Sequence, residues 1–97
     1  MEVRIQAIHF DITDRLTEFI NKKADRLVRH YPNIDYIETL LKVIKPETSM
    51  NKEVVIKAIV PSQGEQTATK VADSFEEAID LALEALDHQL ERIKSKK

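Results

Sequence analysis

Apolar and polar residues change their spacing several times along this 97-residue chain, and each change predicts a new structural element. Near the N-terminus, Val3, Ile5 and Ala7 alternate with polar residues, a period of two that predicts a half-buried strand. The spacing then becomes helical, with Thr13 as a suitable N-cap and Pro32 as the residue that stops the helix. The apolar face expected for this helix consists of Leu16, Phe19, Ile20, Ala24, Leu27 and Val28.

Three strands and a second helix are predicted after Pro32. Alternation returns over residues 36–45 and 54–60, and a polar loop over 46–52 separates them. The only glycine, Gly64, predicts a turn with positive φ leading into a threonine-rich strand over 65–72.

The last helix is predicted to begin with a capping box, because Ser74 is followed three residues later by Glu77. A long apolar stripe follows it. The stripe residues expected in the core are Phe75, Ile79, Leu83, Leu86 and Leu90.

The predicted order is therefore β-α-β-β-β-α, an α+β fold. We expect a four-stranded, mostly antiparallel sheet with both helices packed on one face, and the other face open to water or a partner. Residues 1–97 are expected to form a single domain, with 92–97 as a basic tail that frays.

The composition of the chain excludes several classes of function. There is no cysteine, which excludes disulfides and thiolate metal sites, and aromatic residues make up only 5% of the chain, which argues against RNA binding by stacked rings. No segment approaches the roughly 20 apolar residues that cross a bilayer, so we expect a cytoplasmic protein that does not contact membranes.

The net charge of −2 conceals an uneven distribution. Charged residues over 73–91 are all acidic, whereas the last six residues are rich in lysine and arginine. On a helical wheel, four basic residues of the first helix share a narrow arc opposite the core. They are Arg15, Lys22, Arg26 and Arg29. This arc is either an ordinary solvated face or a row of phosphate contacts. Lys42 and Lys45 also allow two interpretations. They either prevent the strand from pairing with another chain or contact RNA.

No catalytic or metal site is predicted. The carboxylates that follow one another along the last helix lie on its polar face, where nothing would shift a pKa for acid–base chemistry. Glu84 and His88 have a spacing that can hold a metal, but a third ligand is not evident. We expect no enzyme, no cofactor and no small-molecule substrate.

Four segments, in their order and spacing, resemble the ribosome hibernation promoting factor family, also called ribosome-associated inhibitor or sigma-54 modulation protein. These segments are Ile12-Thr13 with the helix after it, Leu41-Lys42-Val43-Ile44-Lys45, residues 73–80 and residues 89–94. The resemblance spans essentially the whole chain. Because the chain stops just after the second helix, it resembles the short form, which lacks the C-terminal dimerisation domain.

The resemblance implies a fold like a double-stranded-RNA-binding domain with an added strand. It also implies binding to the small ribosomal subunit, in the channel for messenger and transfer RNA, which silences translation in stationary phase or under stress. The partners implied are ribosomal RNA and ribosomal proteins of the small subunit. Together with Arg29 from the basic arc, the expected RNA-binding residues are Lys23, Arg26, Arg29, Lys42, Lys45, Arg92 and Lys94.

The last helix departs from the family. Ala85 and His88 stand where basic residues are expected, with Asp87 between them, so this helix is less suited to RNA. Two alternatives follow: the helix contacts basic tails of ribosomal proteins, or the protein binds more weakly. The alternative function is a protein-interaction module that modulates transcription, as the sigma-54 label implies.

Overall fold

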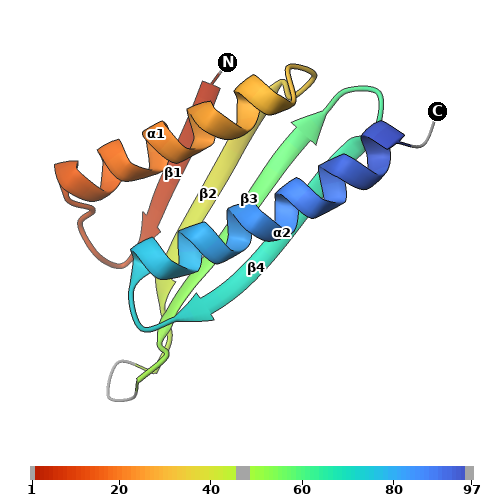
Figure 1. Ribbon diagram of the computed structural model, residues 1–97. Coiled ribbons are helices and arrows are strands. Elements are labelled where there is room, and N and C mark those ends of the chain that lie inside the picture. Colours follow the sequence, from red (N-terminus) through yellow and green to blue (C-terminus); the bar gives the residue numbers. More distant parts are fainter. Residues whose placement is uncertain (1, 46–48, 96–97) are drawn as a thin grey trace.

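The computed structural model describes residues 2–45 and 49–95 and has the predicted order of elements (Figure 1). Strands β1 to β4 form one sheet in sequence order, in which β1 and β2 are parallel and the other neighbours are antiparallel. The predicted fold class is confirmed, because both helices cover the same face of this sheet (Figure 1). The bounds are β1 Glu2–Ile8, α1 Asp14–His30, β2 Tyr36–Val43, β3 Lys52–Val60, β4 Gly64–Ala72 and α2 Phe75–Ser95.

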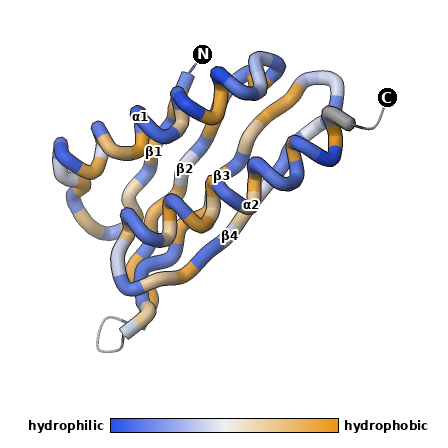
Figure 2. The backbone as a smooth tube through the Cα atoms, in the orientation of Figure 1, coloured by the Kyte–Doolittle hydropathy of each residue, from blue (hydrophilic) through white to orange (hydrophobic). Residues whose placement is uncertain are grey.

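The core lies between the helices and the sheet. Successive strand residues point to opposite faces, so Ile37 and Leu41 of β2 and Val54 and Ile56 of β3 are buried under the helices. Apolar and polar residues alternate along these elements in Figure 2. Neither of the two described helices covers the opposite face of the sheet, called the open face below. Across the described residues, neither helix combines the length and apolar character that a membrane crossing requires.

Most of the predicted core is confirmed. Phe19 and Leu83 are only partly buried. Phe19 lies beneath the Lys23 ammonium group, and Leu83 lines the groove between the helices. The predicted core residues that are buried are Leu16, Ile20, Leu27, Phe75, Ile79, Leu86 and Leu90.

The N-caps predicted at Thr13 and Ser74 and the tight turn are also confirmed. Thr13 Oγ1 accepts a hydrogen bond from the Leu16 amide at 3.1 Å, and Ser74 Oγ accepts one from the Glu77 amide at 3.2 Å. Gly64 has a φ of 84°, where a residue with a Cβ atom would be strained.

Strand β2 ends two residues earlier than the alternation predicted, at Val43. The Ile44 amide still donates to the Asn51 carbonyl at 2.8 Å, but Lys45 takes a positive φ of 48°, so the chain leaves the sheet there. Part of the predicted polar loop, residues 46–48, lies outside the described residues.

Candidate nucleic-acid interface

The basic arc of α1 faces outward. Arg15, Lys22, Arg26 and Arg29 are all exposed. Arg29 Nη2 lies 2.8 Å from Asp25 Oδ2 of the same helix, and both side chains are more than half exposed, at 79% and 56%. An ion pair this exposed contributes little stability. A phosphate oxygen can therefore replace the Asp25 carboxylate as the partner of Arg29 at small cost.

Lys23 points away from this arc, toward α2. Its Nζ lies 3.3 Å from Asp80 Oδ1 and 5.4 Å from the centre of the Phe19 ring, and its side chain is 31% exposed. The Lys23 charge therefore joins the two helices. Asp80 is the partner that the sequence analysis missed, because no local spacing relates it to Lys23.

A groove of about 280 Å³ separates α1 from α2. It has basic groups on its α1 side, carboxylates on its α2 side and leucines between them. The lining residues are Lys23, Arg26, Leu27, His30, Asp80, Leu83, Glu84 and Asp87. An RNA phosphate entering this groove would meet the carboxylates, so the outer side of α1 is the better surface for nucleic acid.

Tyr31 ties the end of α1 to α2. Its hydroxyl lies 2.6 Å from Asp87 Oδ1 and 3.0 Å from Glu91 Oε2, and the residue is buried. Burial, with the two neighbouring carboxylates, raises the pKa of the Tyr31 hydroxyl above its usual value. Asp87 stands between Ala85 and His88, where the resemblance leads one to expect basic residues, and this contact gives it a structural role.

The remaining predicted RNA-binding residues lie at opposite ends of the molecule, whose longest extent is 46 Å. Lys42 is exposed on the open face, next to Glu53 at the start of β3, and Lys45 follows β2. Arg92 lies in the last turns of α2 beside Gln66, near the β3–β4 turn. Lys94 is also in the last turn of α2, since the helix continues into the predicted basic tail.

The structure therefore groups the seven expected residues in three places. Arg26 and Arg29 lie together on the outer side of α1, with Lys23 turned toward α2. Lys42 and Lys45 lie at the end of β2, and Arg92 and Lys94 lie at the end of α2. A single RNA strand following only one of these places would not meet the other two.

Two solved structures share this fold. A ribosomal subunit interface protein from Coxiella burnetii superposes with a TM-score of 0.87 at 24% identity, covering 99% of this chain and all of that one. The N-terminal domain of Thermus thermophilus Protein Y superposes with a TM-score of 0.75 at 22% identity, covering 95% of this chain and 94% of that one.

Sequence comparison identifies the family. The model of the family described as sigma 54 modulation protein / S30EA ribosomal protein matches residues 3–97, and the chain belongs to this family. Among curated relatives, the ribosome hibernation promoting factor of Azotobacter vinelandii is 30% identical over 96 residues, covering 99% of this chain and 85% of that protein. Its namesake from Pseudomonas putida is 28% identical over 96 residues, covering 99% and 89%.

Proposed function

We propose that this chain is a ribosome hibernation factor. It binds the small ribosomal subunit in the channel for messenger and transfer RNA and silences translation in stationary phase or under stress. Family membership, the names of the curated relatives and the shared fold support this proposal. It acts in the cytoplasm by binding alone, without a cofactor or a chemical step.

The observation that carries the RNA part of the proposal is the outward basic arc of α1. Arg26 and Arg29 are exposed and adjacent, and of these two only Arg29 has an ion-pair partner among the described residues, the exposed Asp25. Phosphate contacts of this kind position a protein on RNA without reading its sequence. The other proposed contacts are Lys23, Lys42, Lys45, Arg92 and Lys94. Lys23 would first have to leave Asp80.

The test is a salt series of small-subunit binding. Each lost phosphate contact reduces the slope of log affinity against log salt by about 0.7 to 0.9. The double variant Arg26→Gln/Arg29→Gln should bind more weakly and with a flatter slope than the parent. Because both side chains are exposed, its thermal melting should change little.

A matched control pair is needed to separate specific phosphate contacts from an attraction to RNA that depends only on the total charge of the protein. Lys52 is unsuitable for this control, because it is half-buried and its Nζ lies 2.6 Å from Asn51 Oδ1, so its replacement would also change a contact within the fold. Lys57→Gln/Lys70→Gln removes the same charge from the sheet instead of from α1. Equal losses from both double variants would show that only total charge matters. A folded Arg26→Gln/Arg29→Gln protein with unchanged affinity would refute the α1 contact.

A protein partner is the second candidate, favoured by the carboxylates along α2 that face the groove. Binding that scarcely responds to salt, and to either double variant, would support this candidate and the transcriptional role that the family's sigma 54 description implies.

A further inference from the structure

The open face of the sheet carries paired side chains on its two central strands. Strand register places four β2 residues of this face directly beside four β3 residues. Each pair is chemically matched, either two apolar groups or two opposite charges. The pairs are Tyr36 with Ile59, Glu38 with Lys57, Leu40 with Val55, and Lys42 with Glu53.

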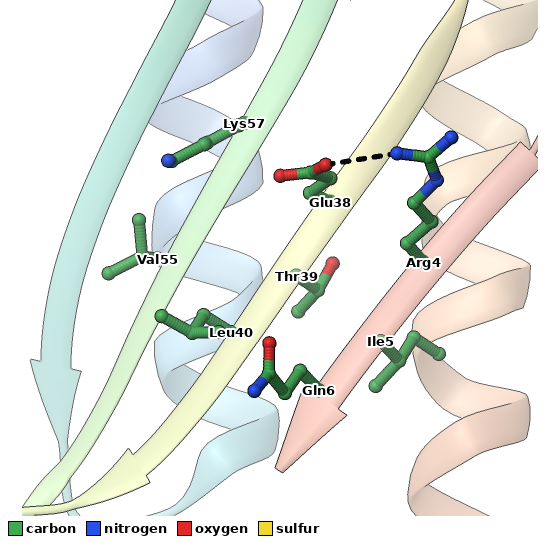
Figure 3. A pocket seen from close by; sticks show the side chains of 8 residues that line it. All are labelled: Arg4, Ile5, Gln6, Glu38, Thr39, Leu40, Val55 and Lys57. Carbon is green, nitrogen blue, oxygen red and sulfur yellow. Dashed lines mark hydrogen bonds and ion pairs between the residues drawn. The ribbon is translucent and has the colours of Figure 1, made fainter. Parts of the chain in front are cut away.

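A hollow of about 420 Å³ lies on this face, with Leu40 and Val55 among its lining residues (Figure 3). Charged groups surround the apolar centre. Arg4 Nη1 lies 3.3 Å from Glu38 Oε1, and Lys57 Nζ lies 3.5 Å from Glu65 Oε1. Leu40 and Val55 thus form a small apolar centre inside a charged rim.

We propose that the open face binds a second copy of this chain, sheet against sheet, about a two-fold axis that runs parallel to the strands between β2 and β3. Such an axis places each β2 side chain opposite its own β3 neighbour from the second copy. Glu38 then faces Lys57 of the second copy, and Leu40 faces its Val55. The matching that stabilises the sheet within one chain thus also makes the face complementary to itself.

A two-fold axis in the plane of the sheet but perpendicular to the strands makes different pairs. Passing through the Leu40–Val55 row, it would place Glu38 opposite Lys42 of the second copy and Lys57 opposite its Glu53. Paired charge reversal at Glu38 and Lys57 distinguishes the two axes, because only the parallel axis brings these two residues of different copies together.

The outer strands fit the same arrangement at three of four positions. Register places Ile8 of β1 and Val71 of β4 in one row, Gln6 and Thr69 in another, and Arg4 and Thr67 in a third, so these would meet across the interface. Glu2 and Glu65 would meet at one corner, where Arg4 Nε already lies 2.6 Å from Glu2 Oε2 and neutralises it.

Lys42 is the one RNA contact proposed on this face, and the dimer would bury it, so self-association and an RNA contact at Lys42 exclude each other. For the rest of the face, nucleic acid is the less favourable occupant. Four carboxylates, those of Glu2, Glu38, Glu53 and Glu65, outnumber three cations, those of Arg4, Lys42 and Lys57. A phosphate backbone would be repelled by this surface on balance, whereas a second copy would satisfy both signs of charge.

The test measures self-association by sedimentation equilibrium of the purified chain up to about 1 mM, the range in which weak dimers form. The parent should associate as concentration rises. Glu38→Lys and Lys57→Glu should each weaken association at least tenfold, since each homodimer would contain two pairs of like charge. An equimolar mixture of the two variants should recover association as a heterodimer, because every pair is then opposite in charge.

Controls separate this interface from general effects. Lys22→Glu makes the same charge change on the outer side of α1 and should leave association unchanged. Circular dichroism melting verifies that the variants fold. If a charge reversal unfolds the chain, Val55→Arg serves instead, since a long charged side chain there blocks close approach of two sheets and should abolish association.

A monomeric parent at all concentrations would overturn the proposal. So would a mixture of Glu38→Lys and Lys57→Glu that associates no better than either alone. A monomeric parent whose Lys57→Glu variant loses affinity for RNA would overturn it as well and assign the face to nucleic acid.

Discussion

Replacing Tyr31 with phenylalanine removes one oxygen atom and keeps the buried ring. The lost hydroxyl contacts Asp87 and Glu91, and thereby joins the end of α1 to α2. Hydrogen bonds to charged groups contribute about 1.5–3 kcal/mol. Both carboxylates belong to exposed residues and can regain water, so we expect a loss near the lower end, about 1–2 kcal/mol. Each kcal/mol lowers Tm by roughly 4–8 °C in a domain of this size.

The effect should depend on pH in a defined direction. The folded state raises the pKa of the Tyr31 hydroxyl above the ordinary value of 10.0, so folding holds this proton more tightly than the unfolded chain does. The stabilisation is therefore complete below about pH 10 and is lost as pH rises above it. The Tyr31→Phe variant has no such proton to lose. The stability gap between parent and variant should be constant from about pH 7 to 9 and should narrow above pH 10.

Urea unfolding followed by far-ultraviolet circular dichroism at several pH values measures this gap, with Tyr36→Phe on the open face as the matched control. The chain has two tyrosines, so in the Tyr36→Phe protein the tyrosinate absorbance reports Tyr31 alone and its midpoint should lie above 10. A Tyr31→Phe variant as stable as the parent at neutral pH, or a gap that does not change with pH, would show that the hydroxyl does not join the helices.

Two further stability predictions concern the core. Leu86→Ala should lower the free energy of unfolding by about 2–5 kcal/mol, because Leu86 is fully buried. Leu81→Ala on the same helix should cost much less, because Leu81 is 40% exposed. Equal melting of the two variants would show that the assigned buried face of the helix is wrong. Thr39 Oγ1 is buried without a hydrogen-bond partner among the described residues. The free energy of unfolding of Thr39→Val, measured in urea, should therefore equal or exceed that of the parent. A loss of stability above about 1 kcal/mol would show that the hydroxyl has a partner.

The elements of this protein were readable from the sequence because each is encoded by residues close together in the chain. A period of two gave the strands, a helical period gave both apolar stripes, and the hydroxyls of Thr13 and Ser74 marked the helix starts. Gly64 marked the turn for the same reason, since its backbone angle is a local property.

The positions of the charged groups relative to one another required the tertiary structure. Arg26 and Arg29 lie on one helix face, and the wheel predicted their direction. Lys23 belongs to the same helix, yet its direction depends on Asp80, which lies beside it only because α2 packs along α1.

The open face shows the same limit for the sheet. Alternation placed Lys57 on one face of its strand. It did not predict that Lys57 lies beside Glu38, or on the same side of the sheet as Lys42, because strand register depends on how separate segments pair. Local spacing thus determines which elements form and which side of each is apolar. Which side chains meet is decided by packing between segments that are distant in the chain, since such contacts leave no periodic signal in the sequence.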